Sequence, residues 1–266
     1  MKRAILIVLM LSVAPTGAAI AAEDAVQTAR KLYRTHQDSV LFVLAVARIE
    51  ATAAGKTLPA QEQKIEAIGT VIDRSGLTVI SYSAINPGLA LRGRKFRTSS
   101  GTVTIQAKTD FKEVKIRLSD GTEVPAKMVL TDIDLDLAFI LPDADSDEAK
   151  GASFNPIRLE KPAKLDVLDE AIALGRLDKS LDRRPTVVVG RIGAIVKKPR
   201  TFYRATVGSL GGPVFAADGR IVGITVRRMV DERPSATVLL PAQDVQEIAK
   251  QALARKKPAK KEPAKD

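Results

Sequence analysis

Short apolar runs separated by polar turns make up the middle of the chain. The runs are rich in Val, Ile, Leu and Thr, and Gly, Pro and Asp gather between them. Runs of this length and composition favour strands, and many of them in succession are typical of all-β barrels. The clearest predicted strands are residues 40–49, 102–107, 114–118, 186–190 and 220–226.

Helix is expected only at the two ends of this β region. Residues 22–35 can form a short amphipathic helix with Val26, Leu32 and Tyr33 partly on one face. A second helix is expected after residues 239–245, at the end of the last strand.

The first 21 residues have the pattern of a signal peptide. A positive start at Lys2 and Arg3 precedes a largely apolar stretch of ten residues (4–13), and a small-x-small cleavage site ends at Ala21. The apolar run is too short for a membrane span of about 20 residues. We therefore expect an exported protein of the bacterial periplasm or another extracytoplasmic space, with Ala22 as its first mature residue.

Composition adds constraints on stability and domain organisation. The chain has 266 residues and no cysteine, so it has neither a disulfide framework nor a lipoprotein anchor. The expected divisions are a signal peptide (1–21), a helical segment (22–38), one β domain (39–254) and a Lys/Pro/Ala-rich disordered tail (255–266).

The net charge of +11 points to an anionic partner. Six basic residues lie in the tail, and smaller basic clusters occur at 92–97, 183–184, 197–200 and 227–228. An anionic envelope component is a candidate ligand of the tail, although each cluster alone is more typical of a solvated loop. Nucleic acid is disfavoured as a partner, because aromatic residues are 4% of the chain and no nucleic-acid motif accompanies the basic residues.

A glycine-rich loop at residues 208–213 carries the most specific signal. Gly208-Ser209-Leu210-Gly211-Gly212-Pro213 resembles the nucleophile loop of trypsin-like serine proteases, Gly-Asn/Asp-Ser-Gly-Gly-Pro. The glycines of such a loop let successive N–H groups point at one oxyanion. The resemblance places Leu210 at the serine position, and Gly208 and Ser209 in the oxyanion loop.

Five other segments extend the resemblance to the HtrA/Deg branch of that family. Residues 218–224 are similar to the turn and apolar strand that follow the serine in that branch, and residues 239–245 to the entry into its last helix. Residues 119–127 are similar to a family hairpin. Asp132-Ile133-Asp134-Leu135-Asp136-Leu137-Ala138 resembles "Asp-x-x-x-Asp-Leu-Ala", which makes Asp136 the matched catalytic acid. Residues 69–85 are similar to the segment that carries the general-base histidine, and Ala84 stands at its position.

The resemblance covers roughly residues 39–253 and implies a trypsin-like double six-stranded β-barrel. Loss of the serine or the histidine typically costs about 10⁶ in turnover. The residues therefore predict a catalytically inactive homologue that acts by binding a peptide or protein in the former cleft, by scaffolding or by regulation. The alternative is an active HtrA-like endopeptidase with a misregistered or atypical active site.

Three serines need a separate interpretation. Ser209 could be a displaced nucleophile, but adjacent side chains in a tight loop project in different directions, and no histidine is near to activate it. Ser81 and Ser83 flank Ala84, and we expect them to satisfy the backbone of their own strand-to-turn segment.

Asp136 and His36 have plain structural alternatives. The alternation of aspartates at 132, 134 and 136 with apolar residues predicts a strand whose carboxylates lie on a solvated face. Asp136 then either caps a backbone N–H or stays hydrated. A calcium loop is disfavoured, because Leu137 replaces the turn glycine.

His36 is the one histidine of the chain, and we expect its side chain to be solvated or bonded to backbone, with no functional role.

The remaining expectations concern partners. No cofactor and no metal are predicted. The trimeric assembly frequent in the HtrA family is implied by the resemblance alone, so a homo-oligomer is an open alternative. The PDZ domains that commonly follow the protease domain are not expected after residue 254.

Overall fold

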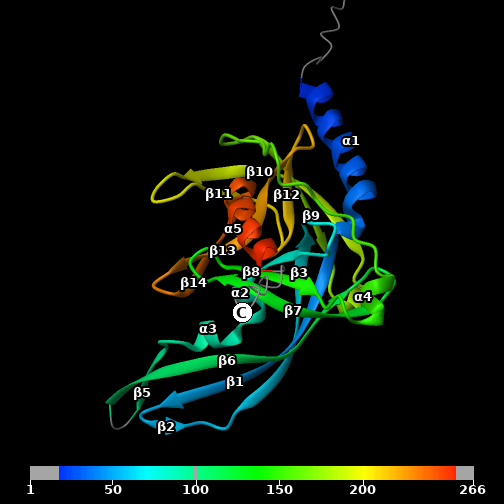
Figure 1. The fold of residues 1–266 in the computed structure, drawn as a ribbon. Helices are drawn as coiled ribbons and strands as arrows, with labels where there is room; N and C mark the ends of the chain where they lie inside the picture. Colours follow the sequence, from blue (N-terminus) through cyan, green and yellow to red (C-terminus); the bar gives the residue numbers. More distant parts are fainter. Residues whose placement is uncertain (1–17, 99–100, 256–266) are drawn as a thin grey trace, which may run out of the picture.

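The computed structural model describes residues 18–98 and 101–255, and strands dominate it. The first barrel is built from β1 (Val40–Ala53), β3 (Gln61–Val71), β4 (Thr78–Ser81), β8 (Leu137–Pro142), β7 (Glu123–Asp132) and β6 (Gly101–Arg117). Each strand pairs with the next in that order, and β6 pairs back with β1, so the sheet closes on itself. β2 (Lys56–Thr57) and β5 (Lys95–Thr98) extend this sheet beyond the barrel as a protruding arm (Figure 1).

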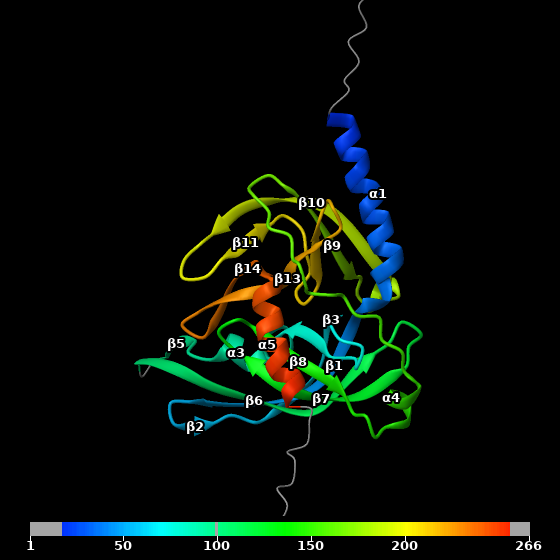
Figure 2. The same cartoon turned by 45° about the horizontal axis from the view of Figure 1, so that its top comes forward.

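The second barrel follows in the chain and stacks on the first, as Figure 2 shows. Its closed order is β10 (Pro185–Val196), β11 (Phe202–Ala205), β14 (Arg233–Pro241), β13 (Ile221–Val230), β12 (Pro213–Ala216) and β9 (Glu170–Arg176). The predicted double six-stranded barrel is confirmed.

The strands next to the boundary between the barrels are buried on both faces. On β8, Ala138 and Ile140 point into the first barrel, whereas Leu137 and Phe139 pack in a core shared with the second barrel. The residues of β9 alternate in the same way between the shared core and the interior of the second barrel. Since side chains alternate across a strand, two buried faces require a continuous apolar run, as the sequence of β8 has.

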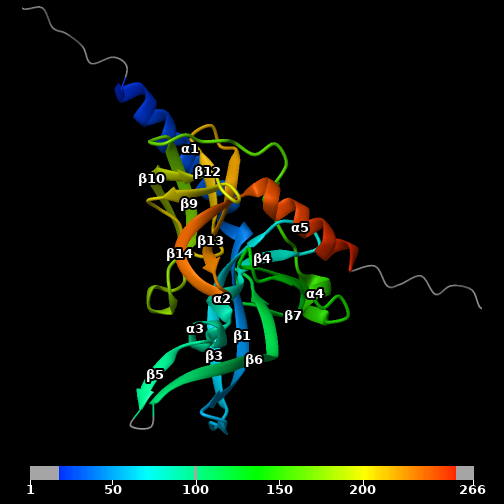
Figure 3. The same cartoon turned by 90° about the vertical axis from the view of Figure 1, so that its left-hand side faces the viewer.

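Helices lie at both ends and also between strands. α1 (Ala18–His36) runs beside the second barrel, and α5 (Ala242–Ala254) packs on strands of both barrels (Figure 3). The expectation of helix only at the ends is wrong: α2 (Tyr82–Ile85), α3 (Pro87–Leu91) and α4 (Asp147–Gly151) are internal, as are the short 3₁₀ turns η1 (Gln37–Ser39) and η2 (Lys179–Leu181). Two local signals explain the internal helices. Pro87 begins α3, and the Ser146 hydroxyl accepts a hydrogen bond from the third residue of α4, Ala149, at 3.1 Å.

The inner face of α1 differs from the predicted one. Ala25, Ala29 and Leu32 are buried, at a spacing that puts them on one helical stripe, and Val26 is 37% exposed. Small residues on this stripe let the helix lie close to the barrel.

Most residues of the predicted signal peptide and of the predicted tail lie outside the described part of the chain. Residues 1–17 of the predicted signal peptide and residues 256–266 of the predicted disordered tail lie outside it, and residues 18–21 begin α1. In the part of the chain that is described, no helix has the length and apolar character needed to cross a membrane.

Candidate functional site

Asp136 lies fully buried in the turn between β7 and β8. Its φ is 57°, in the left-handed region that Asp and Asn tolerate best among residues with a Cβ. The carboxylate accepts four hydrogen bonds: from the Ser81 hydroxyl (2.5 Å), the Ser83 hydroxyl (3.2 Å), the Ser83 N–H (2.6 Å) and the Arg227 N–H (2.7 Å). Three segments that are far apart in the sequence therefore meet on one side chain.

Two opposing effects act on the pKa of Asp136. Burial raises the pKa, because it disfavours the charged carboxylate, and the hydrogen bonds from Ser81, Arg227 and Ser83 act in the opposite direction. The direction is upward, so desolvation is the larger effect. No cationic side chain forms an ion pair with Asp136 among the described residues, so hydrogen bonds alone satisfy this group.

The aspartate run does not form the predicted strand. β7 ends at Asp132, residues 133–136 turn, and β8 begins at Leu137. Asp132 holds the turn through its side chain, which accepts a hydrogen bond from the Leu135 N–H at 3.0 Å. The expectation of a solvated carboxylate at 136 is wrong, and the alternative of a backbone-capping role is the one observed. Four residues without strand geometry break the alternation on which the solvated-face prediction depended.

Ser81 and Ser83 bind the carboxylate of Asp136 rather than their own backbone, contrary to expectation. Ser81 ends β4 and Ser83 lies in α2, so both hydroxyls reach the same oxygen. Ala84 follows directly in α2, half-buried against the core of the first barrel. Nothing in the sequence of Ser81 and Ser83 indicates that they bind residue 136. Likewise, nothing in the sequence indicates that the Arg227 N–H donates to the same carboxylate.

The glycine-rich loop packs against the first barrel. The Gly211 carbonyl accepts a hydrogen bond from the Thr70 hydroxyl at 2.7 Å, and its N–H donates to the Thr225 carbonyl at 2.7 Å. A Cβ on Gly211 would lie 1.9 Å from the Ile68 carbonyl oxygen and 3.6 Å from the Cα of Ile80, so only glycine fits here. The loop is thereby held beside the end of β4, the strand that leads to Ser81 and α2.

Three N–H groups of this loop have no hydrogen-bond partner within the described residues. They belong to Gly208, Ser209 and Leu210, while the neighbouring Gly212 N–H donates to the Ser209 carbonyl at 2.8 Å. Among the described residues the Thr225 hydroxyl is buried without a hydrogen-bond partner, 2.6 Å from where a Cβ of Gly208 would lie. Unpaired N–H donors of such a loop can receive a carbonyl or carboxylate oxygen.

Ser209 and His36 point elsewhere. The Ser209 hydroxyl lies 3.1 Å from the position of a Cβ on Gly175, so its side chain faces β9 of the second barrel. His36 stacks on Phe215 with ring centroids 5.8 Å apart, and its Nδ1 lies 3.4 Å from the Ser39 hydroxyl. The expectation that His36 is solvated or backbone-bonded is wrong, because the end of α1 buries half of the ring against β12.

The structure thus brings the surroundings of the three predicted positions into one region. Asp136 bonds the residue before Ala84, and the glycine after Leu210 lies beside Ile80 and bonds Thr225, two residues before the second backbone donor to Asp136. In the described ranges no cluster of three or more His, Cys, Asp or Glu side chains could hold a metal ion. The chemistry that this arrangement offers is hydrogen bonding.

Two side-chain contacts join the barrels between the end of α3 and the β13–β14 hairpin. Arg92, after α3, forms an ion pair of 3.1 Å with Glu232 at the tip of the β13–β14 hairpin. Next to it, the Arg233 guanidinium donates to the Gly93 carbonyl at 2.7 Å. We name these two contacts the rim clasp.

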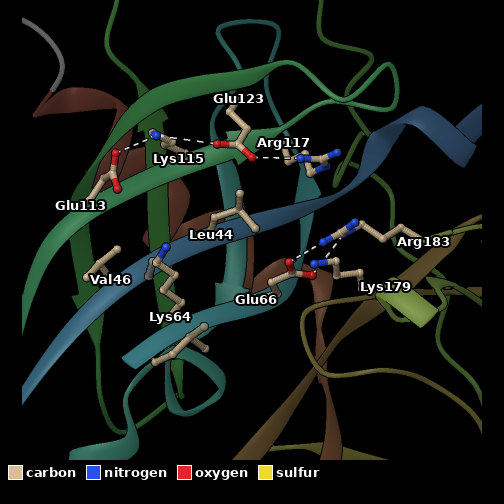
Figure 4. A pocket seen from close by; sticks show the side chains of 12 residues that line it. Leu44, Val46, Lys64, Glu66, Glu113, Lys115, Arg117, Glu123, Lys179 and Arg183 are labelled. Atoms are coloured by element: carbon tan, nitrogen blue, oxygen red, sulfur yellow. Dashed lines mark hydrogen bonds and ion pairs between the residues drawn. The ribbon is translucent and has the colours of Figure 1, made fainter. Parts of the chain in front are cut away.

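A separate polar pocket lies on the outside of the first barrel (Figure 4). It has a volume of about 490 Å³, and Leu44 and Val46 of β1 form its apolar floor. One side carries charged residues of β6 and β7, and the other carries charged residues of β3 and of η2 and the turn after it (Figure 4). These charged residues are Glu113, Lys115, Arg117 and Glu123 on one side, and Lys64, Glu66, Lys179 and Arg183 on the other.

Most charges of this pocket neutralise one another. Glu123 pairs with both Arg117 and Lys115, and Arg183 makes a two-nitrogen contact with Glu66 at 3.1 and 2.5 Å. Arg183 belongs to the second barrel region and Glu66 to the first, so this pair also ties the barrels together. We assign the pocket a structural role.

Comparison with known proteins agrees with this architecture. Residues 69–224 match the model of the trypsin-like peptidase domain, a range that includes Ala84, Asp136 and Leu210. The chain is also similar to a protein of Bacillus subtilis (strain 168) named serine protease Do-like HtrA, with 30% identity over 158 residues. That alignment covers 53% of this chain and 33% of the relative, so the chain spans about a third of the protein that it matches. With the two closed barrels and the family match over more than half of its length, the chain belongs to the trypsin-like peptidase domain family.

Proposed function

We propose that this chain is an exported, non-hydrolysing HtrA-type domain that binds a peptide or protein segment in the cleft beside Asp136. Hydrolysis by a triad needs a nucleophile, a base and an acid that orients the base. At the positions that the resemblance assigns to the nucleophile and the base, Leu210 and Ala84 supply neither group.

The hydrogen bonding of Asp136 is the observation that carries this proposal. An orienting acid accepts a hydrogen bond from the imidazole of the base, whereas the four donors to this carboxylate, three on Oδ2 and one on Oδ1, are hydroxyl and N–H groups of Ser81, Ser83 and Arg227. Within the described residues, the carboxylate therefore serves as an acceptor for structural donors. No imidazole is in contact with it, since His36 stacks on Phe215.

The glycine-rich loop supports a binding role. The N–H groups of Gly208 and Leu210 have no partner within the described residues, so a ligand oxygen can pair with them without displacing an existing hydrogen bond. Leu210 is half-buried and adds an apolar surface at the same place. Peptides offer both a row of carbonyl oxygens and apolar side chains.

The rim clasp limits how such a segment enters. Its ion pair is exposed, with 36% of the Arg92 side chain and 64% of the Glu232 side chain accessible, and exposed pairs contribute little stability. A ligand can therefore displace the clasp at small cost.

Export and the basic tail complete the proposal. The signal-peptide pattern of residues 1–21 supports delivery to an extracytoplasmic space, and six basic residues after α5 suit an anionic envelope component. Periplasmic fractionation of the full-length chain tests the first point. A mature N-terminus at Ala22 is the expected result, and a cytoplasmic protein that retains Met1 would contradict it.

Hydrolysis is tested with two reagents on the purified chain. We expect no casein fragments and no labelling by an active-site fluorophosphonate probe, with an active trypsin-like protease as the positive control. Labelling of Ser209 or of any other serine, together with casein cleavage, would favour the alternative of an active endopeptidase with an atypical site.

Binding is tested by the fluorescence anisotropy of labelled, unfolded casein. Leu210→Asp places a carboxylate beside the unpaired N–H donors, where it competes with a ligand oxygen, so we expect affinity to fall at least about tenfold. The matched control is Leu181→Asp, at an exposed position in η2. Equal binding by the two variants would remove the cleft from the proposal.

A further inference from the structure

The strand β5 forms a free edge of the arm. It pairs with β6 on one side and is the last strand in the order of its sheet, so its other side has no strand partner within the described residues. Residues 95–97 are exposed, and the arm projects beyond the barrel (Figures 1 and 3). An accessible edge of this kind is a template on which another chain can add a strand.

The hydrogen bonds to β6 show which backbone groups face the free edge. The Ile105 N–H of β6 donates to the Arg94 carbonyl at 2.9 Å, which makes these two residues a hydrogen-bonded pair. Such pairs alternate with non-hydrogen-bonded ones along an antiparallel ladder, so Phe96 is the next residue of β5 that bonds β6. The N–H and C=O groups of Lys95 and Arg97 therefore point away from β6. In the described ranges no hydrogen bond occupies these four groups.

The side chains of this edge carry unpaired positive charge. Arg94, Lys95 and Arg97 form no ion pair with any described residue, and the paired segment of β6, residues 101–105, has no charged side chain. Glu232 of the β13–β14 hairpin pairs with Arg92, which precedes the strand. Cations on an edge strand repel a second copy of the same strand. The charge therefore disfavours pairing between two copies of β5 and favours an acidic partner.

The two faces of β5 differ in chemistry. Lys95 and Arg97 lie on one face, opposite two threonines of β6. Phe96 lies on the other face, where it pairs with Val103 and is still 48% exposed. An added strand continues both faces, since directly opposite residues of paired strands lie side by side on one face. A matching strand therefore alternates acidic residues beside the two cations with an apolar residue beside Phe96.

We propose that β5 binds an extended acidic peptide segment as an additional antiparallel strand. The main-chain groups of Lys95 and Arg97 supply the pairing, their side chains select acidic residues, and Phe96 accepts the apolar residue between them. An antiparallel strand continues the arrangement of the β5–β6 pair and is the more stable one. A nucleic acid or a lipid surface offers negative charge without the main-chain groups, so it matches only part of this edge.

Fluorescence anisotropy of a labelled Glu-Val-Glu-Val-Glu peptide with blocked ends, titrated with the full chain, tests the proposal. We expect saturable binding. A Lys-Val-Lys-Val-Lys peptide has the same alternation and the opposite charge, and it should not bind. Absence of saturable binding by the acidic peptide, or equal binding of the two peptides, would overturn the proposal.

N-methylation of the peptide separates strand pairing from attraction between charges. In the proposed pairing the Glu residues lie opposite Lys95 and Arg97, so the central Glu N–H donates to β5, whereas the Val N–H groups point to solvent. Methylation of the central Glu nitrogen should therefore weaken binding about tenfold. Methylation of a Val nitrogen is the matched control and should leave the affinity unchanged. Equal effects at both positions, or an effect at Val alone, would overturn the antiparallel pairing.

Charge-reversal variants of the chain locate the bound peptide. Arg97→Glu places like charges opposite each other and should weaken binding at least about tenfold. Lys56→Glu reverses an exposed charge on β2, at the opposite edge of the sheet, and should bind as the unmodified chain does. The proposal does not depend on the cleft beside Asp136, because Leu210→Asp and Arg97→Glu report on the two sites separately. If Arg97→Glu and Lys56→Glu bind the acidic peptide equally, the peptide does not lie on β5.

Discussion

Asp136 combines full burial with donors from β4, α2 and β13. A buried carboxylate without a cationic partner is costly unless hydrogen bonds replace its lost hydration, and here four donors do so. Two of the donors are backbone N–H groups, which need an acceptor themselves. The carboxylate and its donors therefore depend on one another.

Asp136→Asn should destabilise the chain by about 2–3 kcal/mol. Asparagine tolerates the left-handed backbone at this position, but its amide nitrogen cannot accept, so it leaves one of the N–H donors of Ser83 or Arg227 unpaired. Urea denaturation followed by circular dichroism measures the change. Asp134→Asn, exposed in the same turn, is the control and should lie within about 0.5 kcal/mol of the unmodified chain.

His36 should make stability depend on pH near neutrality. Burial lowers the pKa of His36 below its unfolded value of about 6.5. The unfolded chain then binds the proton first as pH falls, so the contribution of neutral His36 is complete above pH 6.5 or so and is lost as the pH falls toward the folded pKa.

His36→Phe isolates this effect, because it keeps an aromatic ring against Phe215 and removes the titration. Between pH 7.5 and 5, the free energy of unfolding of the unmodified chain should fall relative to that of the variant. A difference in the free energy of unfolding between the two proteins that stays constant over this range would show that burial does not lower the pKa of His36. Comparing the two proteins cancels other groups, including Asp136, whose raised pKa acts with the opposite sign.

At the scale of elements, Arg176 attaches the N-terminal segment to the second barrel. Its side chain is 8% exposed and donates to the carbonyls of Val40, Gln37 (2.9 Å) and Arg183 (3.1 Å). One guanidinium thus joins the end of β9, the start of β1 and the turn after η2. The planar fork of arginine suits three such acceptors, and the single ammonium of lysine does not.

Arg176→Lys should therefore loosen α1 and η1 from the barrel. We expect a loss of about 2 kcal/mol or more in stability, since carbonyls held near a buried charge lose their donor. Limited proteolysis should cut the variant between residues 36 and 40 faster than the unmodified chain. Arg184→Lys, exposed in the same turn, should be cut at the unchanged rate.

The elements were predictable where the apolar pattern alone decides them. β1 contains its predicted run, and β13 contains all of its run except Arg220, because buried strands need apolar residues at every core position. β10 contains the run 186–190 although Val188 and Val189 are exposed, so the strand preference of valine decides there rather than burial. The runs at 102–107 and 114–118 are parts of one long strand, β6, since the polar residues between them still pair with β1. Hydrogen bonding to a partner strand, which no local pattern reports, decides the ends of such an element.

The candidate site was predictable in part. The resemblance pointed to Asp136, Ala84 and the glycine-rich loop, but the donors to Asp136 come from distant segments that the fold brings together.

At the scale of the whole molecule, the barrels share their largest core. Phe139 of the first barrel packs in the same cluster as Phe215 and Ile224 of the second, and α5 covers both. The Glu66–Arg183 pair and the Thr70–Gly211 hydrogen bond add polar connections. We expect the barrels to unfold together.

Calorimetry of two neighbouring variants on β8 tests this cooperativity. Phe139→Leu affects the shared core and Ile140→Val the interior of the first barrel, and each should cost about 1 kcal/mol. Each variant should unfold in a single transition, with a midpoint temperature a few degrees below that of the unmodified chain. A separate early transition in Ile140→Val would mean that the first barrel melts by itself.

The position of Asp136 where the barrels meet suggests how a degrading enzyme can lose its chemistry and keep its shape. Under the proposed function, selection for turnover no longer acts on residues 84 and 210, which an alanine and a leucine fill without leaving polar groups stranded. The acid is different, because its loss would leave donors from both halves of the molecule without an acceptor. Of the three positions, residue 136 is the one at which a substitution destabilises the folded protein, so it is the one that neutral evolution keeps.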